Sequence, residues 1–600
     1  MNAMKKYSNK TVPADLQQIS GRDFYLLTGI LFILTFIYFL VVAHHVPAFQ
    51  EEEFLFLFSG EYFKGFLARP GGLIEYAGRF LMQFYAIPIL AALEIAVILS
   101  VPGVLLHAIL KKIKTVQLFI VPLSLLPSIL LILMQNQYYH LMEYNLGYIC
   151  ILSYFLITFE QRKIWLHIFL YPLLFYTAGA FALIYMVFEI VYSLVFNRAS
   201  RKIYEPFALL LTGILSYFVF REILFLVPGR SLLTWPLPLV NEHLHRIIFW
   251  TLTTYIIFIP LLSSSSIIHN PGPVLRKYAG IILSSLIIIL SAAILYRIND
   301  KSISKVMDIQ NEAYKGAWDK VIKEHEKYPS GNLISQYFYN TALSERGLLC
   351  DRLFTTGQSF GTKALILPWG DQYLERGAYF FFSVGLVNEA HRWAYEEMVV
   401  YGLRPHNLLM LIKTSILDGN FRIAEKYLNI LRKTAFYRGE ALKYHKMLAD
   451  KGNILSDAEL APISKIIPQK DFFIYMDSPE DNLPMLFESN QGNKRAFEYM
   501  MSWLLLEKDV ETIVNNLHLM KDMGYTKIPR SIEEAILIYY NSQRKFPDMG
   551  GLTISPGTLS RFDQYFSTYV KARNNPAMLQ QTMFEKFGDT FWYYFHFQKP

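Results

Sequence analysis

Long apolar segments are confined almost entirely to the first half of the chain, and this uneven distribution limits the possible folds more than any other feature. A helix needs roughly 20 apolar residues to cross the hydrocarbon core of a bilayer. Several segments before Asn299 approach or exceed that length, whereas the second half alternates short apolar and polar stretches. The sequence therefore predicts an all-α protein with a polytopic membrane domain followed by a water-soluble domain.

About nine membrane-spanning helices are predicted in the first half. Residues 24–43 are long enough to span, and no small-residue cleavage site follows them, so they predict an uncleaved first span rather than a signal peptide. Residues 164–177 and 180–196 are short and are separated by Ala178, Gly179 and Ala180, which predicts a tight helical hairpin. The predicted spans are residues 24–43, 81–110, 116–134, 144–159, 164–177, 180–196, 206–226, 247–262 and 279–296.

The basic residues between the spans predict an orientation. Short loops rich in Lys and Arg favour the cytoplasmic face. Alternate loops of this chain hold most of these residues, which predicts a cytoplasmic N-terminus, residues 1–23, in a multi-pass protein of the cytoplasmic (inner) membrane. Nine spans then place the second half outside the cytoplasm, in the periplasm. The residues that favour the cytoplasmic face are Lys111, Lys112, Lys114, Arg162, Lys163, Arg198, Arg201, Lys202, Arg276 and Lys277.

Composition excludes two other classes of protein. The net charge of +8 would suit nucleic-acid binding, but many of the basic residues lie in loops between predicted spans, so no nucleic-acid partner is expected. Two cysteines, Cys150 and Cys350, are too few for a disulfide framework, and neither has a neighbour at metal-ligand spacing.

The first predicted outer loop, residues 44–80 of the membrane domain 24–298, carries the main candidate site. Glu51, Glu52 and Glu53 lie just beyond the end of the first span, and an aromatic-rich amphipathic stretch comes next. One interpretation is that these glutamates are catalytic, as a general base, or ligands for a divalent cation such as Mg²⁺ or Mn²⁺. The alternative is that they only hydrate the mouth of the loop.

Other polar residues on the predicted outer side could complete a substrate-binding site. Arg221 lies toward the outer end of the seventh span, where its guanidinium could hold a phosphate or simply pair with a nearby carboxylate. His243 and His245 are two residues apart and would not share a helix face, so they are not expected to form a metal pair. The candidate substrate-binding residues are Arg79, His140, Glu143, Arg221, Glu242 and His243.

The second half predicts paired helices. Gly385 and Gly419 are 34 residues apart, and an alanine follows each after five residues, at Ala390 and Ala424. A period of 34 residues with Gly at the turn and Ala at a close helix crossing resembles the tetratricopeptide repeat, whose stacked units usually bind a protein or peptide. The predicted divisions are a repeat domain at 299–461, a linker at 462–490, and a second helical lobe with an aromatic tail at 491–600.

Two family resemblances bear on function. Residues 70–84, PGGLIEYAGRFLMQF, resemble an uncharacterised family of multi-span membrane proteins from Bacteroidota. An acidic cluster soon after the first span, then interfacial helices and a second span, is similar to the GT-C class of membrane glycosyltransferases. That resemblance implies a polyprenyl-phosphate-linked sugar donor, a membrane-lipid environment and a catalytic carboxylate among Glu51, Glu52 and Glu53.

Three functional hypotheses follow. The first is a GT-C-like glycosyl or glycan transferase that works at the outer face of the membrane. The second is a membrane-anchored scaffold without enzymatic activity, whose repeats bind envelope proteins. The third is a transporter or lipid flippase, which the intramembrane residues Glu94, Glu189 and Arg221 would suit.

Overall fold

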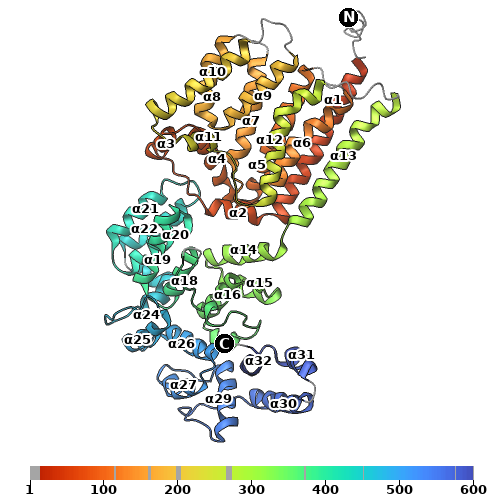
Figure 1. The fold of residues 1–600 in the computed structure, drawn as a ribbon. Helices are drawn as coiled ribbons and strands as arrows, with labels where there is room; N and C mark the ends of the chain where they lie inside the picture. Colours follow the sequence, from red (N-terminus) through yellow and green to blue (C-terminus); the bar gives the residue numbers. More distant parts are fainter. Residues whose placement is uncertain are drawn as a thin grey trace, which may run out of the picture. The chain divides into compact units, whose positions relative to one another are not determined.

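The computed structural model describes residues 14–113, 117–159, 164–196, 204–264, 273–370, 373–450, 452–573 and 576–598. Within these ranges the regular elements are helices, α1 to α32 with short 3₁₀ and π turns, and no strand occurs. The all-α class is therefore confirmed. Contacts divide the chain into two compact units, Met1–Asp300 and Lys301–Pro600, which we call the N-terminal and C-terminal units (Figure 1).

The N-terminal unit is a bundle of apolar helices. Among the described residues, six helical segments are long and apolar enough to cross a membrane: Gly21–Val42, Pro88–Lys112, Met142–Phe159, Pro206–Leu224, His243–Ser263 and Tyr278–Ile298. Three shorter apolar helices, Phe119–Gln135, Ile168–Ala178 and Phe181–Phe196, lie at the other predicted positions. These lengths and compositions are those of a membrane protein, while the count of nine spans stays a prediction.

Exposed apolar side chains mark the outer surface of this bundle. On α13 (Pro273–Ile298), Ile282 and Ile289 are each 64% exposed, and on α8 (Ile164–Ala178) Phe169 is 72% exposed. A water-soluble domain rarely exposes so much contiguous apolar surface, whereas a lipid-facing one does so by necessity.

Small residues bring α5 (Pro88–Lys112) close to α6 (Gln117–Gln135). The backbone N–H of Gly103 donates to the Ser128 hydroxyl at 3.0 Å, and a Cβ at Gly103 would lie 2.9 Å from that oxygen. Close approach at small residues is how helices pack in lipid, where no hydrophobic drive brings them together.

The first outer loop is helical. It forms α2 (His45–Glu52), α3 (Gly60–Leu67) and α4 (Gly72–Met82), and α4 packs against α7 (Met142–Phe159) and α8. Figure 1 shows these helices, with α11 (Gly229–Thr234), toward the end of the unit where α13 ends. The second apolar helix begins at Pro88 rather than at 81, because Gln83–Ala86 forms a 3₁₀ turn and Ile87, which precedes a proline, is extended.

The remaining membrane helices are α9 (Phe181–Phe196), α10 (Tyr204–Val219) and α12 (His243–Ser264), and α1 runs over Ala14–Ile37. Many of the basic residues that support the predicted orientation lie outside the described residues, as do residues 1–13. They are Lys114, Arg162, Lys163, Arg198, Arg201 and Lys202. The orientation therefore stays a prediction.

The C-terminal unit begins with helix pairs joined by glycine turns. Gly316, Gly347, Gly385 and Gly419 all have positive φ angles, between 63° and 84°. The N–H that follows each glycine bonds to a carbonyl five residues back, as in Leu386 to Phe381 at 2.9 Å and Asn420 to Ser415 at 2.8 Å. This left-handed helix ending suits glycine. The helices concerned are α14 (Lys301–Tyr314), α15 (Trp318–Lys327), α16 (Leu333–Glu345), α17 (Leu349–Arg352), α18 (Leu374–Ser383), α19 (Val387–Tyr401), α20 (Pro405–Leu417) and α21 (Phe421–Leu431).

The two alanines that mark the predicted 34-residue period are both fully buried, Ala390 on α19 and Ala424 on α21. Each lies in the first turns of the helix after a glycine turn, and each helix packs on the one before it. Small side chains at these positions let consecutive helices approach closely. The tetratricopeptide-like assignment itself stays a prediction.

The rest of the unit continues as helices. The stretch predicted as a linker, 462–490, contains the end of α24 (Leu460–Ile466) and α25 (Asn482–Ser489). Just after it, the Asn493 amide donates to the carbonyls of Val384 and Ile466 at 2.9 and 3.2 Å. The later helices are α22 (Arg438–Ala449), α23 (Gly452–Ser456), α26 (Lys494–Glu507), α27 (Val510–Asn515), α28 (His518–Asp522), α29 (Arg530–Gln543), α30 (Pro556–Ala572), α31 (Pro576–Phe587) and α32 (Phe591–Phe597).

The aromatic tail is α32, and it packs on the C-terminal unit itself. The Trp592 indole N–H donates to the Glu534 carbonyl at 2.8 Å, and the Phe591 N–H donates to the Glu534 carboxylate at 2.6 Å. Burial raises the pKa of Glu534 to about 7, although Arg530 opposes this shift. The tail is therefore part of the core.

Candidate functional site

A cavity of about 490 Å³ lies in the N-terminal unit, where three loops of the predicted outer side meet. Glu53, just after α2, contributes a half-buried carboxylate to it. Aromatic rings from the α6–α7 loop and from the segment after α11 form much of the wall. The lining residues are Glu53, Phe54, Tyr138, Tyr139, Leu141, Tyr144, Thr234, Trp235, Leu237, Leu239, Val240 and Asn241.

A cluster of three charged residues around one buried carboxylate lies against this cavity. Glu75 on α4 is fully buried and pairs with Arg69 and with Arg79, the latter at 2.8 Å between Nη2 and Oε1. The Arg69 guanidinium lies 4.6 Å from the centre of the Trp235 ring, and that of Arg79 lies 4.6 Å from the Phe54 ring. Because both rings line the cavity, the cluster supports two of its walls from behind.

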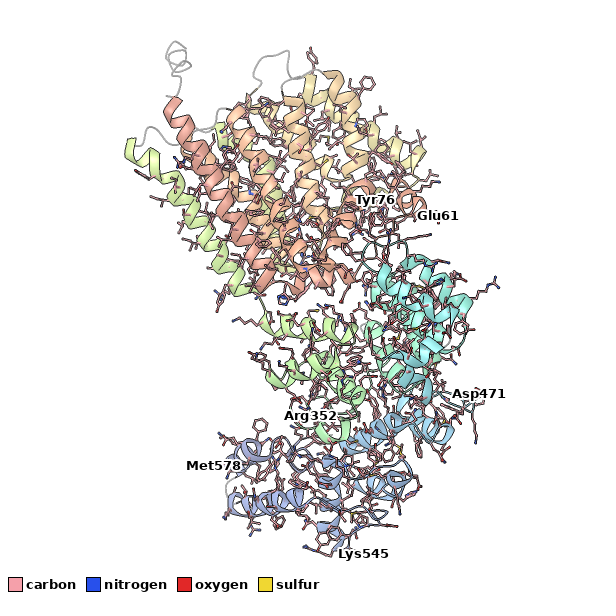
Figure 2. All side chains as sticks on the ribbon, turned by 180° about the vertical axis from the view of Figure 1, so that it is seen from behind. Glu61, Tyr76, Arg352, Asp471, Lys545 and Met578 are labelled. Atoms are coloured by element: carbon pink, nitrogen blue, oxygen red, sulfur yellow. The ribbon has the colours of Figure 1, made fainter. Side chains whose placement is uncertain are left out.

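Burial lowers the pKa of Arg79, but Glu75, Tyr62 and Glu143 together raise it by more, so the net pKa is above its usual value. The guanidinium therefore stays charged although its surroundings are apolar. Tyr76 of the same helix, labelled in Figure 2, contributes to the aromatic packing around the cluster, with its ring 4.9 Å from that of Phe63 and 5.5 Å from that of Phe66.

Glu75 and Arg79 both belong to the stretch 70–84. A family model matches residues 21–598, nearly the whole chain and both units, and its description is a family of unknown function, DUF6057. The chain belongs to the DUF6057 family. No glycosyltransferase or tetratricopeptide family model matches it. No curated protein and no solved structure matches the chain.

In this DUF6057 protein, Glu143 lies behind α4 rather than in the cavity. Its side chain is 1% exposed, and a Cβ at Gly78 would lie 2.8 Å from its Oε2 atom. Among the described residues that oxygen has no hydrogen-bond partner. Glu143 is therefore close to the ion cluster, while its neighbour Tyr144 faces the cavity.

His140 belongs to a buried network of neutral polar side chains. Its Nδ1 atom lies 2.9 Å from Nε2 of His245, and its Nε2 atom lies 3.0 Å from the Asn145 amide oxygen. The Gln50 amide donates to the carbonyls of Tyr138 and His140 at 3.0 and 2.8 Å. Burial, followed by the adjacent His245, holds the pKa of His140 well below its usual range. The network fixes the α6–α7 loop that carries Tyr138 and Tyr139 into the cavity wall.

Glu242 and His243 do not join the cavity residues. The Glu242 carboxylate accepts the N–H groups of Leu244 and His245, which caps the first turn of α12. His243 instead lines a shallow groove on α12 with Arg246 and Trp250. The structure therefore gives Glu242 a local structural contact and places His243 on another surface.

Arg221 also stands apart from the cavity. It pairs with the adjacent Glu222 at 3.1 Å in a π-helical turn, Phe220–Leu224, and both side chains are largely exposed, at 44% and 58%. Glu51 and Glu52 are in the last turn of α2 and are not among the cavity residues. Among the described residues, no three His, Cys, Asp or Glu side chains converge as a metal site requires.

Sequence reasoning missed Arg69, Glu75 and Trp235, which border the cavity. A usable signal was present for two of the three charged residues of the ion cluster, because Glu75 and Arg79 are four residues apart and so share a helix face. No local pattern pointed to Trp235, which lies about 160 residues farther along the chain.

Proposed function

We propose that this protein is a GT-C-like transferase embedded in the cytoplasmic membrane, and that it uses a polyprenyl-phosphate-linked donor at the outer face. The observation that carries the proposal is Glu53 in the wall of an aromatic cavity, just after α2, the short helix that follows the first apolar helix. Of the three adjacent glutamates only Glu53 is a cavity residue, so we assign it the catalytic role.

In the proposed reaction, the Glu53 carboxylate takes the proton from an acceptor hydroxyl. The hydroxyl oxygen then bonds to the anomeric carbon of the donor, and the polyprenyl phosphate leaves with the electron pair of the broken bond. A base held within hydrogen-bond reach typically contributes a factor of about 10² to 10⁴ in rate.

The surroundings of Glu53 suit the two ends of such a donor. Tyr138, Tyr139 and Trp235 offer ring faces to a sugar. Arg69 does not line the cavity and pairs with Glu75, but its side chain is 44% exposed and stacks on Trp235, so its guanidinium could meet a donor phosphate beside the cavity. A divalent cation, Mg²⁺ or Mn²⁺, would take Glu53 as one oxygen ligand and donor phosphate oxygens as others.

We further propose nine spans with a cytoplasmic N-terminus, and a C-terminal unit outside the cytoplasm. The four glycine turns support tetratricopeptide-like stacking of the helix pairs. Such a surface would hold a protein or peptide partner, for example one that bears the acceptor.

The test is the replacement of Glu53 by Gln in cells, with Glu52→Gln as the matched control. We expect Glu53→Gln to lower the transfer of envelope glycan by about 100-fold or more, the lower bound for loss of a general base. Glu52→Gln should leave transfer within a few-fold of the wild type. Unchanged glycans at normal protein levels of Glu53→Gln would contradict the proposal.

A non-enzymatic scaffold is the second candidate. The pairing of Glu75 with both Arg69 and Arg79 favours it, since charges neutralised within the protein serve packing rather than substrate binding. In that case neither glutamate substitution would change any glycan, whereas deletion of the helix pairs would release bound envelope proteins.

A further inference from the structure

A second cavity, of about 240 Å³, lies wholly within the C-terminal unit and has a different chemistry. It is formed by α17, by the start of α26 and by the segment between α28 and α29. Acidic groups and lysines share its wall, with few apolar side chains. The lining residues are Gly347, Cys350, Asp351, Lys494, Glu498, Gly524, Tyr525, Thr526, Lys527 and Pro529.

Glu498 is the buried group in this cavity. Its side chain is 7% exposed, and the Tyr525 hydroxyl donates to its Oε1 atom at 3.1 Å. Its Oε2 atom is buried and has no hydrogen-bond partner among the described residues. A buried carboxylate oxygen without a donor is unfavourable, so the site is suited to receive one.

Burial, together with a smaller contribution from Asp351, raises the pKa of Glu498 to about 7, although the hydrogen bond from Tyr525 and the charges of Arg495 and Lys494 oppose this shift. A cationic donor would lower that pKa again by stabilising the carboxylate.

The other acidic and nucleophilic groups of the cavity already have structural contacts. One Asp351 carboxylate oxygen accepts the Arg530 N–H at 2.9 Å, and the Cys350 thiol donates to the Glu498 carbonyl at 3.4 Å. Glu498 Oε2 is therefore a buried acceptor in this cavity that a ligand could satisfy.

Two cations line the same cavity. Lys494 and Lys527 are exposed, and the Lys494 ammonium lies 4.9 Å from the centre of the Tyr525 ring. The cavity thus combines a buried acceptor with ammonium groups that solvent reaches. A phosphate or a dicarboxylate would satisfy the lysines but would be repelled by Glu498, and a simple amine would leave the lysines unused.

We propose that this cavity binds a small α-amino acid, whose ammonium group donates to Glu498 and whose carboxylate pairs with Lys494 and Lys527. The size is appropriate, since 240 Å³ corresponds to about eight water volumes at about 30 Å³ each. The proposal does not depend on the transferase activity, because every lining residue belongs to the C-terminal unit.

The test uses the full-length protein in detergent micelles, titrated with glycine, L-alanine and D-alanine as probes. We expect at least one probe to bind, and N-acetylalanine and ethylamine to bind at least about 10-fold more weakly. Affinity should fall about 10-fold per pH unit below pH 7, because a protonated Glu498 loses the charge that holds the ammonium group.

Glu498→Gln should weaken binding at least about 10-fold, and Lys494→Met and Lys527→Met should each weaken it several-fold. Lys521→Met, an exposed lysine outside the cavity, is the control and should bind normally. Thermal melts establish that each variant is folded, and the isosteric Gln can still accept the Tyr525 hydroxyl. The proposal would be overturned if none of the three probes binds at about 10 mM, which is on the order of the weakest useful affinity. It would also be overturned if N-acetylalanine binds as tightly as the free amino acids, or if folded Glu498→Gln binds them normally.

Discussion

Replacing Glu75 by Gln should destabilise the N-terminal unit by about 3–5 kcal/mol, the usual cost of removing one partner from a buried ion pair. The carboxylate is fully buried and pairs with two arginines, so its loss removes the ion-pair partner of Arg79, whose side chain is only 26% exposed. Thermal unfolding in detergent micelles, followed by tryptophan fluorescence, should show a much lower midpoint.

Glu61 provides the matched control for Glu75. It lies on α3 in the same loop and is exposed, and Figure 2 labels it. Glu61→Gln should change stability by less than about 0.5 kcal/mol, as is usual for surface substitutions. If Glu75→Gln unfolds at the same temperature as Glu61→Gln, the ion cluster does not stabilise the cavity walls.

Replacing Gly377 by Ala should destabilise the C-terminal unit by about 3 kcal/mol, the upper part of the usual range for an overpacked core. A Cβ at Gly377 on α18 would lie 2.1 Å from the ring of Trp393 on α19. That ring is 2% exposed and also contacts Trp369 and Phe381, so it has little room to move. The penalty should exceed the gain of about 1 kcal/mol that Ala brings to a helix interior.

Gly439→Ala is the control for this prediction, because nothing lies within 4 Å of a Cβ at Gly439 in α22. It should be neutral or slightly stabilising in the same chemical denaturation experiment. Combining Gly377→Ala with Trp393→Leu should cost less than the sum of the two single changes, since the smaller side chain removes the clash. Additive effects would contradict the proposed contact.

The local features of this fold could be predicted from the sequence. Apolar length is enough to identify α1, α5 and α13, since helices are the simple way to satisfy backbone groups in lipid. Gly385 and Gly419 mark helix ends because a left-handed residue there favours glycine, and the structure confirms both turns. The resemblance of these pairs to tetratricopeptide repeats rests on the same two turns.

The site could be predicted only in part, because its contacts join distant segments. His140 and His245 are 105 residues apart, and Arg69 meets Trp235 from a different loop. Burial also depends on contacts that the sequence does not show. The sequence predicts Glu143 to be a polar residue of an outer loop, but in the structure its side chain is buried behind α4. The sequence left two interpretations of Arg221 open, a phosphate ligand or a partner of a nearby carboxylate, and in the structure Arg221 pairs with its neighbour Glu222.

Thiol labelling of intact spheroplasts tests the orientation on which the proposed function depends. The experiment starts from a chain in which Cys150 and Cys350 are replaced by Ser, and two single-cysteine variants are made from it. One has a cysteine at Phe473, which is 94% exposed in the C-terminal unit, and the other has a cysteine at Lys111, which is exposed at the end of α5. With a membrane-impermeant maleimide, Phe473→Cys should be labelled without lysis and Lys111→Cys only after lysis. Labelling of Lys111→Cys in intact spheroplasts, with protection of Phe473→Cys, would contradict an extracytoplasmic C-terminal unit.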